Sequence, residues 1–168
     1  MTIHATICTR SREDVTATTD KLLSFLAQCD IKICLISGSR SIFEAYEGAY
    51  AHINPNPEDI LIFCHDDIEI HHSPEEFLNI LKENLDSDEV GFIGPAGTTY
   101  LSPNAIVGDW DYYDINLTSQ AFLKGYTNKA IALNILHNSR GEIAGKEGWE
   151  LNRAAFIANT ELPLQIFK

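Results

Sequence analysis

The triplet His65-Asp66-Asp67 is where residue type and spacing best suit chemistry in this sequence. It directly follows the apolar run Ile60 to Cys64, which is typical of a buried strand. Two adjacent carboxylates at the exit of such a strand repel each other and cost stability unless a cation or hydrogen-bond donors compensate. Carboxylate oxygens favour Mg²⁺ or Mn²⁺, which keep several waters and bridge to substrate phosphates. The sequence therefore predicts a divalent metal at Asp67 and Asp66; the alternative is that both start a turn, with His65 hydrogen-bonded to the backbone.

Two arginines and several small polar residues follow other apolar runs. Arg10 and Arg40 have the planar guanidinium that binds diphosphate oxygens with two hydrogen bonds, although a surface salt bridge is an equally good interpretation. Hydroxyls at Thr9, Ser37 and Ser39 are candidates for contacts to a nucleotide base or ribose, and the alternative is that they form turns.

The elements that must position these residues follow from hydrophobic periodicity. Short apolar runs alternate with amphipathic helical stretches, which is typical of βα units in a parallel sheet. The predicted strands are Ile3 to Cys8, Ile31 to Ile36, Ile60 to Cys64 and Val90 to Ile93. Ligands of such a sheet bind beyond the carboxyl ends of its strands, so the candidate residues should meet at one edge.

Three helices are predicted between the strands, and each has a recognisable start. Their first capping residues are Ser11, Ser41 and Ser73. Ser41 has Glu44 three residues on, the spacing of a capping box, and Pro74 suits a first helical position. Pro55 should end the second helix, because proline disfavours helical geometry in the residue before it.

Beyond the fourth predicted strand the periodicity weakens. The segments predicted there are a turn at Gly94 to Gly97, a cleft-lining loop at Thr98 to Leu117, a strand at Ala130 to Leu136, a turn at Ser139 to Gly141 and a helix at Trp149 to Ala158. The length of 168 residues fits one α/β domain.

Composition excludes several classes of protein. A formal charge of −12 argues against nucleic-acid binding, which needs clustered Lys and Arg. No stretch has the roughly 20 apolar residues of a membrane span, and the N-terminus lacks the pattern of a signal peptide. Four cysteines without CxxC spacing favour buried, reduced thiols over disulfides. A cytoplasmic protein without a membrane span is therefore expected.

The order of these pieces resembles the nucleotide-binding half of family 2-like glycosyltransferases. In that family a first strand ends in Thr-Arg or a near equivalent, a tyrosine-bearing helix follows the second strand, and a later strand ends in a His-x-Asp or Asp-x-Asp metal motif. The matching stretches are Thr6 to Arg12, Ser41 to Tyr50, Ile60 to Ile68, Gly91 to Gly97 and Gly108 to Trp110. The resemblance covers roughly residues 2–110 and implies a three-layer α/β/α, Rossmann-like GT-A fold, with a nucleotide-binding half at 1–97 and a shortened acceptor half at 98–168.

Carried onto this sequence, the resemblance implies that Asp67 binds Mn²⁺ or Mg²⁺ and that Asp66 or His65 faces the ribose or diphosphate. Thr9 and Arg10 would line the nucleotide pocket. The implied activity is metal-dependent transfer of a sugar from a UDP- or GDP-linked donor to a hydroxyl acceptor that the sequence does not identify.

The acceptor side offers candidates for a general base, which an inverting transfer needs to deprotonate the acceptor hydroxyl. Glu147 beside Trp149 is the first choice and Asp109 beside Trp110 the second, because an aromatic ring next to a carboxylate suits stacking on a sugar. Both tryptophans are equally good core residues. The sequence departs from the family at Ser37 to Arg40, where an acidic base contact is usual, and it lacks the family's later Asp-Gly segment.

Two other classes of function remain open. The first is a non-catalytic member of the fold that binds a nucleotide sugar or serves assembly, which the short C-terminal part favours. The second is a metal-dependent phosphohydrolase or nucleotidyltransferase in which His71-His72 adds ligands, although adjacent side chains of an extended segment point to opposite faces.

Overall fold

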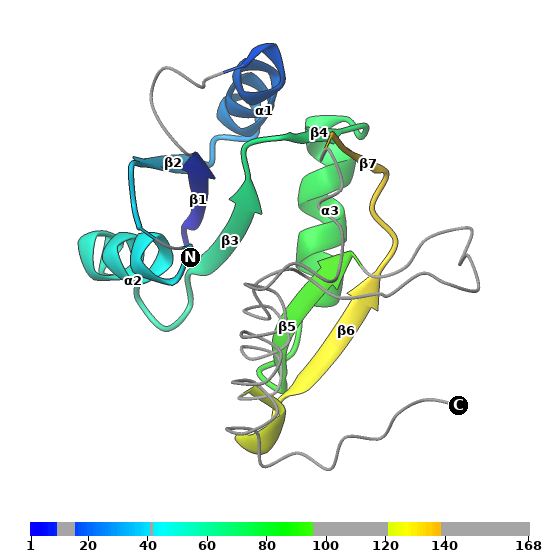
Figure 1. Ribbon diagram of the computed structural model, residues 1–168. Helices are drawn as coiled ribbons and strands as arrows, with labels where there is room; N and C mark the ends of the chain where they lie inside the picture. The colour runs from blue at the N-terminus through cyan, green and yellow to red at the C-terminus, as the bar shows by residue number, and fades with distance from the viewer. Residues whose placement is uncertain (10–15, 41, 96–120, 139–168) are drawn as a thin grey trace, which may run out of the picture. The chain divides into compact units, whose positions relative to one another are not determined.

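The computed structural model describes residues 1–9, 16–40, 42–95 and 121–138 (Figure 1). These residues form a mixed α/β structure that contains a small parallel sheet. They fall into two compact units: residues 1–81 with 133–138 form the first, and residues 82–95 with 121–132 form the second. Every described candidate residue belongs to the first unit.

The first unit is built on a 3-stranded parallel sheet in the order β2-β1-β3. Its strands are β1 (Ile3–Thr9), β2 (Lys32–Ser37) and β3 (Ile60–His65). The predicted strands and their parallel arrangement are confirmed, and each ends one residue later than expected. Central β1 carries Ala5 and Ile7, both fully buried, so its apolar side chains anchor the core.

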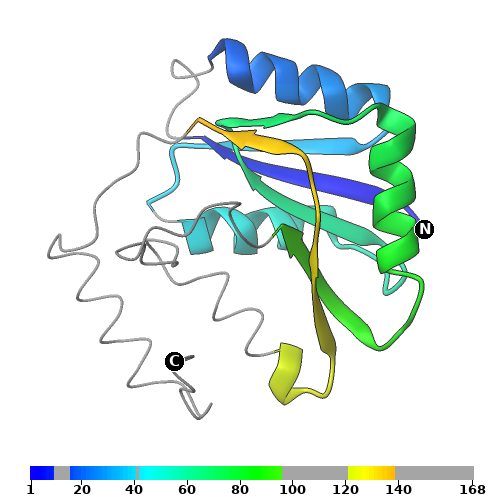
Figure 2. The ribbon, with the colours of Figure 1, turned by 90° about the vertical axis from the view of Figure 1, so that its right-hand side faces the viewer.

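Helices α1 (Ala17–Gln28) and α2 (Ile42–Ile53) lie on opposite faces of this sheet (Figure 2). Leu22 and Leu26 of α1 are buried, and Tyr46 of α2 packs its ring 4.7 Å from that of Phe63 on β3. Burying both faces explains why these strands are almost continuously apolar.

The start of α1 differs from the prediction. Its N-cap is Thr16 rather than Ser11, and Thr16 and Thr19 form a reciprocal capping box. The side chain of Thr16 accepts from the Thr19 amide, and the Thr19 hydroxyl accepts from the Thr16 amide, so two otherwise unpaired donors are satisfied. The spacing of Ser11 and Asp14 suits a helix cap, but α1 is capped by Thr16 and Thr19.

The end of α2 confirms the prediction. The helix stops at Ile53, and Asn54 takes a left-handed conformation with φ 47 while its amide donates to the Tyr50 carbonyl. Asparagine tolerates that conformation, and Pro55 cannot continue the helix.

A third helix, α3 (Pro74–Asn84), begins as predicted. Ser73 and Glu76 cap each other: the Ser73 amide donates to Glu76 Oε2, and the Glu76 amide donates to Ser73 Oγ. The α3 residue Phe77 meets Phe25 of α1 edge to face, with ring centroids 5.4 Å apart. This contact joins the two helices within the first unit.

A short antiparallel pair completes the first unit. Strand β4 (Ile68–Ile70) follows β3 after a turn and pairs with β7 (Ile135–His137), in a register that places Ile68 opposite His137 (Figure 1). Neither strand of this pair was predicted as such, because strands of 3 residues carry no periodicity of their own.

In the second unit, β5 (Val90–Pro95) pairs in parallel with β6 (Thr127–Ile131). The predicted turn at Gly94-Pro95 is wrong, because both residues continue β5 opposite Ala130 and Ile131. The predicted single strand Ala130 to Leu136 is also wrong: its first part pairs with β5, and its last part belongs to β7 and pairs with β4. A uniform apolar run cannot reveal a change of partner strand.

The remaining predictions fall outside the described residues. They concern the helix stretch 10–15, Ser41, Ala96-Gly97, the loop at 98–117, the turn at 139–141, the helix at 149–158 and the boundary between residues 97 and 98. Within the part of the chain that the structure describes, no helix has the length and apolar character needed to cross a bilayer.

Candidate functional site

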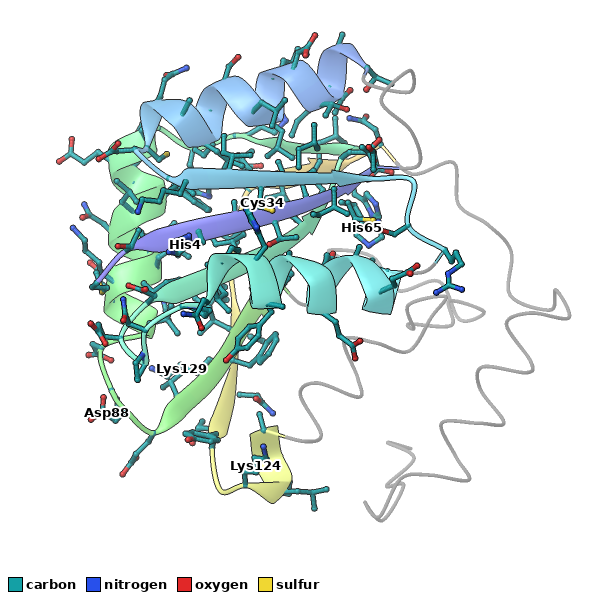
Figure 3. All side chains as sticks on the ribbon, turned by 90° about the vertical axis from the view of Figure 1, so that its left-hand side faces the viewer. His4, Cys34, His65, Asp88, Lys124 and Lys129 are labelled. Atoms are coloured by element: carbon teal, nitrogen blue, oxygen red, sulfur yellow. The ribbon has the colours of Figure 1, made fainter. Side chains whose placement is uncertain are left out.

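The carboxyl edge of the parallel sheet gathers three predicted residues. Thr9 ends β1 directly opposite Ser37 at the end of β2, and Cys8 lies opposite His65 at the end of β3. Figure 3 labels His65 at this edge. The sheet therefore brings Thr9, Ser37 and His65 together, as parallel pairing requires.

Asp66 and Asp67 form the turn that leads from β3 to β4. The Thr19 hydroxyl in the first turn of α1 donates to the Asp66 carbonyl at 3.1 Å, and the Asn138 amide donates to the Asp67 carbonyl at 2.9 Å. The turn is thus held from two sides, by the N-terminal end of α1 and by the residue after β7. The two adjacent carboxylates therefore extend from a stretch of backbone that hydrogen bonds hold in place.

The Asp67 carboxylate has a neighbour that lies far away in the sequence. Its Oδ1 is buried and lies 3.1 Å from His137 Nε2, although the two atoms do not form a well-aligned hydrogen bond. The His137 ring also lies 6.0 Å from the His65 ring, edge to face. His65, Asp67 and His137 therefore share one side of the turn.

His137 was missed by reasoning from sequence. It ends a stretch that the periodicity assigns to one longer strand, and nothing in its local pattern marks it as a partner of Asp67. Only the antiparallel register of β4 against β7 delivers it to the turn.

The negative charge of Asp66 affects the pKa values of two thiols of the sheet, Cys8 and Cys64. Burial, and to a smaller extent the charge of the nearby Asp66 carboxylate, raise the pKa of Cys64 to about 12. Burial and then Asp66 likewise raise the pKa of Cys8. Both thiols stay protonated at neutral pH, so the anionic ligands beside this edge are carboxylates and not thiolates.

Arg40 makes the surface ion pair that was the alternative to a substrate contact. Its Nη2 lies 2.9 Å from Glu44 Oε1, and its amide donates to Glu44 Oε2 at 2.8 Å. The hydrogen bond from the Arg40 side chain is the main reason that the pKa of Glu44 is lowered. The guanidinium is 91% exposed, and its role in substrate binding stays a prediction.

The ring of His72, the second histidine after β4, makes a contact away from the carboxylate turn. His72 Nε2 accepts from the Asn134 amide at 2.8 Å, whereas His71 is bonded through its backbone carbonyl, which accepts from the Asn134 side chain at 3.4 Å. One of the two ring nitrogens with which His72 could bind a metal is thereby occupied.

The residues of the turn fit a hard divalent cation. Asp66 and Asp67 offer carboxylate oxygens, and the buried Asp67 Oδ1 lacks a well-aligned donor. Among the described residues, no group of three or more His, Cys, Asp or Glu side chains is arranged to hold a metal ion. Waters and substrate phosphates would therefore complete the coordination, as is usual for Mg²⁺.

Four predicted residues lie outside the described part of the chain: Arg10, Asp109, Trp110 and Glu147. Their roles stay predictions. Comparison of the chain with protein-family models, with curated proteins and with solved structures finds no significant match.

Proposed function

We propose that this chain is a divalent-metal-dependent glycosyltransferase of the GT-A type, which transfers a sugar from a UDP- or GDP-linked donor to a hydroxyl acceptor. The observation that supports it is the pair Asp66 and Asp67 in a fixed turn directly after β3, at the same edge of the parallel sheet as the ends of β1 and β2. That edge is where open parallel sheets bind nucleotides.

In this proposal Asp67 and Asp66 hold Mn²⁺ or Mg²⁺. The cation, when bound, neutralises the charge that develops on the departing nucleoside diphosphate. The first turn of α1 supports the assignment, since Thr19 bonds to the Asp66 carbonyl and the positive end of the helix dipole lies beside the turn. Thr9 and Ser37 line the nucleotide side, together with His65.

The acceptor side of the proposal rests on the sequence alone, in which Glu147 and Asp109 each stand close to a tryptophan. Glu147, or in its place Asp109, is the general base that deprotonates the acceptor hydroxyl, and Trp110 stacks on the sugar. Arg10 contacts the diphosphate. We further propose a three-layer Rossmann-like arrangement and a cytoplasmic protein, the latter because all four cysteines are free thiols.

The test is calorimetric titration of UDP- and GDP-sugars in Mn²⁺ with three proteins: the unaltered chain, Asp67→Asn and Asp88→Asn. Asp67→Asn keeps the shape of the side chain but removes its charge, and Asp88 is an exposed aspartate of the second unit that serves as the matched control. We expect Mn²⁺-dependent binding that weakens at least about tenfold in Asp67→Asn and is unchanged in Asp88→Asn.

Absence of binding to every donor, or equal binding by Asp67→Asn, would remove the proposal. If a donor binds, its slow hydrolysis in the absence of acceptor separates a transferase from a binding module. Release of phosphate from simple nucleotides would instead favour the phosphohydrolase, although the engagement of His72 with Asn134 weakens that alternative.

A further inference from the structure

The segment that carries β7 is tied to the end of β4 through Asn134. The His71 amide donates to the Asn134 carbonyl at 2.8 Å, and the Asn134 amide donates to His72 Nε2 at 2.8 Å. The Asn134 side chain adds a longer bond to the His71 carbonyl. One residue is thus held through its backbone donor, its backbone acceptor and its side chain.

The bond to the His72 ring requires one protonation state. A backbone N–H only donates, so Nε2 must carry a lone pair and the ring proton must sit on Nδ1. A protonated histidine has a hydrogen on both nitrogens and accepts nothing. Uptake of a proton at Nε2 therefore removes this bond, because the lone pair that accepts the Asn134 amide is then no longer available.

The surroundings of His72 offer its protonated form another partner. Glu76 of α3 faces it: the pKa of Glu76 is lowered first by hydrogen bonds from the backbone and side chain of Ser73, and in part by the charge of His72. Within the described part of the chain, other polar and charged groups around the β4–β7 pair lie beside one another. They are Lys21 of α1 with Glu69 of β4, Asn138 also on Glu69, and His137 of β7 with Asp67.

The contacts of Asn134 with His71 and His72 contribute much of what keeps β7 paired with β4. Each of the two strands has only 3 residues, so few backbone bonds join them, and Asn134 lies immediately before β7. The residue after β7, Asn138, donates to the Asp67 carbonyl at 2.9 Å. Loss of one bond at the start of so short a strand should therefore loosen the segment as far as the carboxylate turn.

We propose that residues 133–138 form a pH-sensitive clasp, closed by the neutral His72 ring through the Asn134 amide and opened when that ring takes up a proton. Opening frees β7 and withdraws the Asn138 amide from the turn of Asp66 and Asp67. The clasp does not depend on the proposed glycosyl transfer, since it rests on contacts between the residues that follow β4 and the residue that precedes β7.

Amide hydrogen exchange, read residue by residue by NMR, tests the clasp. Between pH 7.5 and 5.5, after correction for the intrinsic rate, we expect protection of the Asn134 and Asn138 amides to fall by about five- to tenfold, the effect of losing one hydrogen bond. In His72→Gln a side-chain carbonyl accepts at either pH, so the pH dependence should vanish. His71→Gln is the matched control, because it removes the neighbouring imidazole and leaves the clasp intact.

A second measurement does not depend on a variant that must fold. At pH 7.5 the ¹⁵N shifts of the unaltered His72 ring should show the Nδ1–H tautomer, which a merely structural histidine exposed to water does not favour. The opposite tautomer, a protection of Asn134 that ignores pH, or a His71→Gln protein that loses the pH dependence would each overturn the proposal.

Discussion

The reactivity of the Cys64 thiol reports on how tightly the end of β3 is packed beside the carboxylate turn. Its thiol lies at the end of β3 directly before His65, and burial, aided by Asp66, raises its pKa to about 12. Only the thiolate reacts with alkylating agents. At pH 8 about one Cys64 in ten thousand is a thiolate.

We therefore predict that iodoacetamide at pH 8 spares Cys64 in the folded protein. Mass spectrometry of the digested chain should find that site unmodified after times that label all four cysteines in urea. The urea sample is the control for intrinsic reactivity. Rapid labelling of Cys64 without denaturant would mean that β3 opens readily at the very end that leads into the carboxylates.

The residues of the carboxylate edge divide into those that the sequence could predict and those that it could not. Thr9, Ser37 and His65 each follow a local apolar run, and parallel pairing aligns the ends of such runs, so their meeting was predictable. His137 was not, because its approach to Asp67 depends on the pairing of β4 with β7, two strands that lie far apart in the sequence. Local periodicity holds no information about such pairings.

Helix α1 contributes to the site through the residues that cap it. Thr19 is fully buried, closes the capping box with Thr16, and donates to the Asp66 carbonyl at 3.1 Å. One hydroxyl therefore joins the start of the helix to the carboxylate turn. Removing it should leave the Thr16 amide without its acceptor and the Asp66 carbonyl without this donor.

Thr19→Val tests this role, since valine keeps the shape and loses the hydroxyl. We expect the free energy of unfolding, from urea titration, to fall by about 1–2 kcal/mol. Thr18→Val, one residue earlier on the same helix, is the matched control and should cost about 0.5 kcal/mol or less. Equal losses in the two variants would show that α1 is not coupled to the turn through this bond.

At the scale of elements, the sequence predicts best what is long and periodic. The three parallel strands follow from apolar runs, and the start of α3 follows from its capping box and proline. The start of α1 does not, because Ser11 with Asp14 and Thr16 with Thr19 are both acceptable caps by spacing. The choice between them is made by Thr19, whose second partner is in the turn after β3.

At the scale of the molecule, the dominant feature is charge. The formal net charge is −12 at pH 7, and self-repulsion of that size destabilises any compact state. In the described ranges, each ion pair of a lysine or arginine has at least one well-exposed partner: Lys21 with Glu69, Arg40 with Glu44 and Lys129 with Asp86. Exposed pairs contribute little, typically below about 1 kcal/mol each.

Salt weakens both the repulsion between carboxylates and the attraction within ion pairs. Which of the two is larger decides whether added NaCl raises or lowers the free energy of unfolding. Because unpaired acids outnumber the bases, raising NaCl from about 50 to 500 mM should stabilise the protein by about 1 kcal/mol, a rise in Tm of roughly 2–4 °C. Glu58→Lys, at an exposed residue of the turn before β3, should raise Tm at low salt and flatten its dependence on salt. A Tm that falls with NaCl would mean instead that the few ion pairs, and not the excess of carboxylates, govern the stability of the fold.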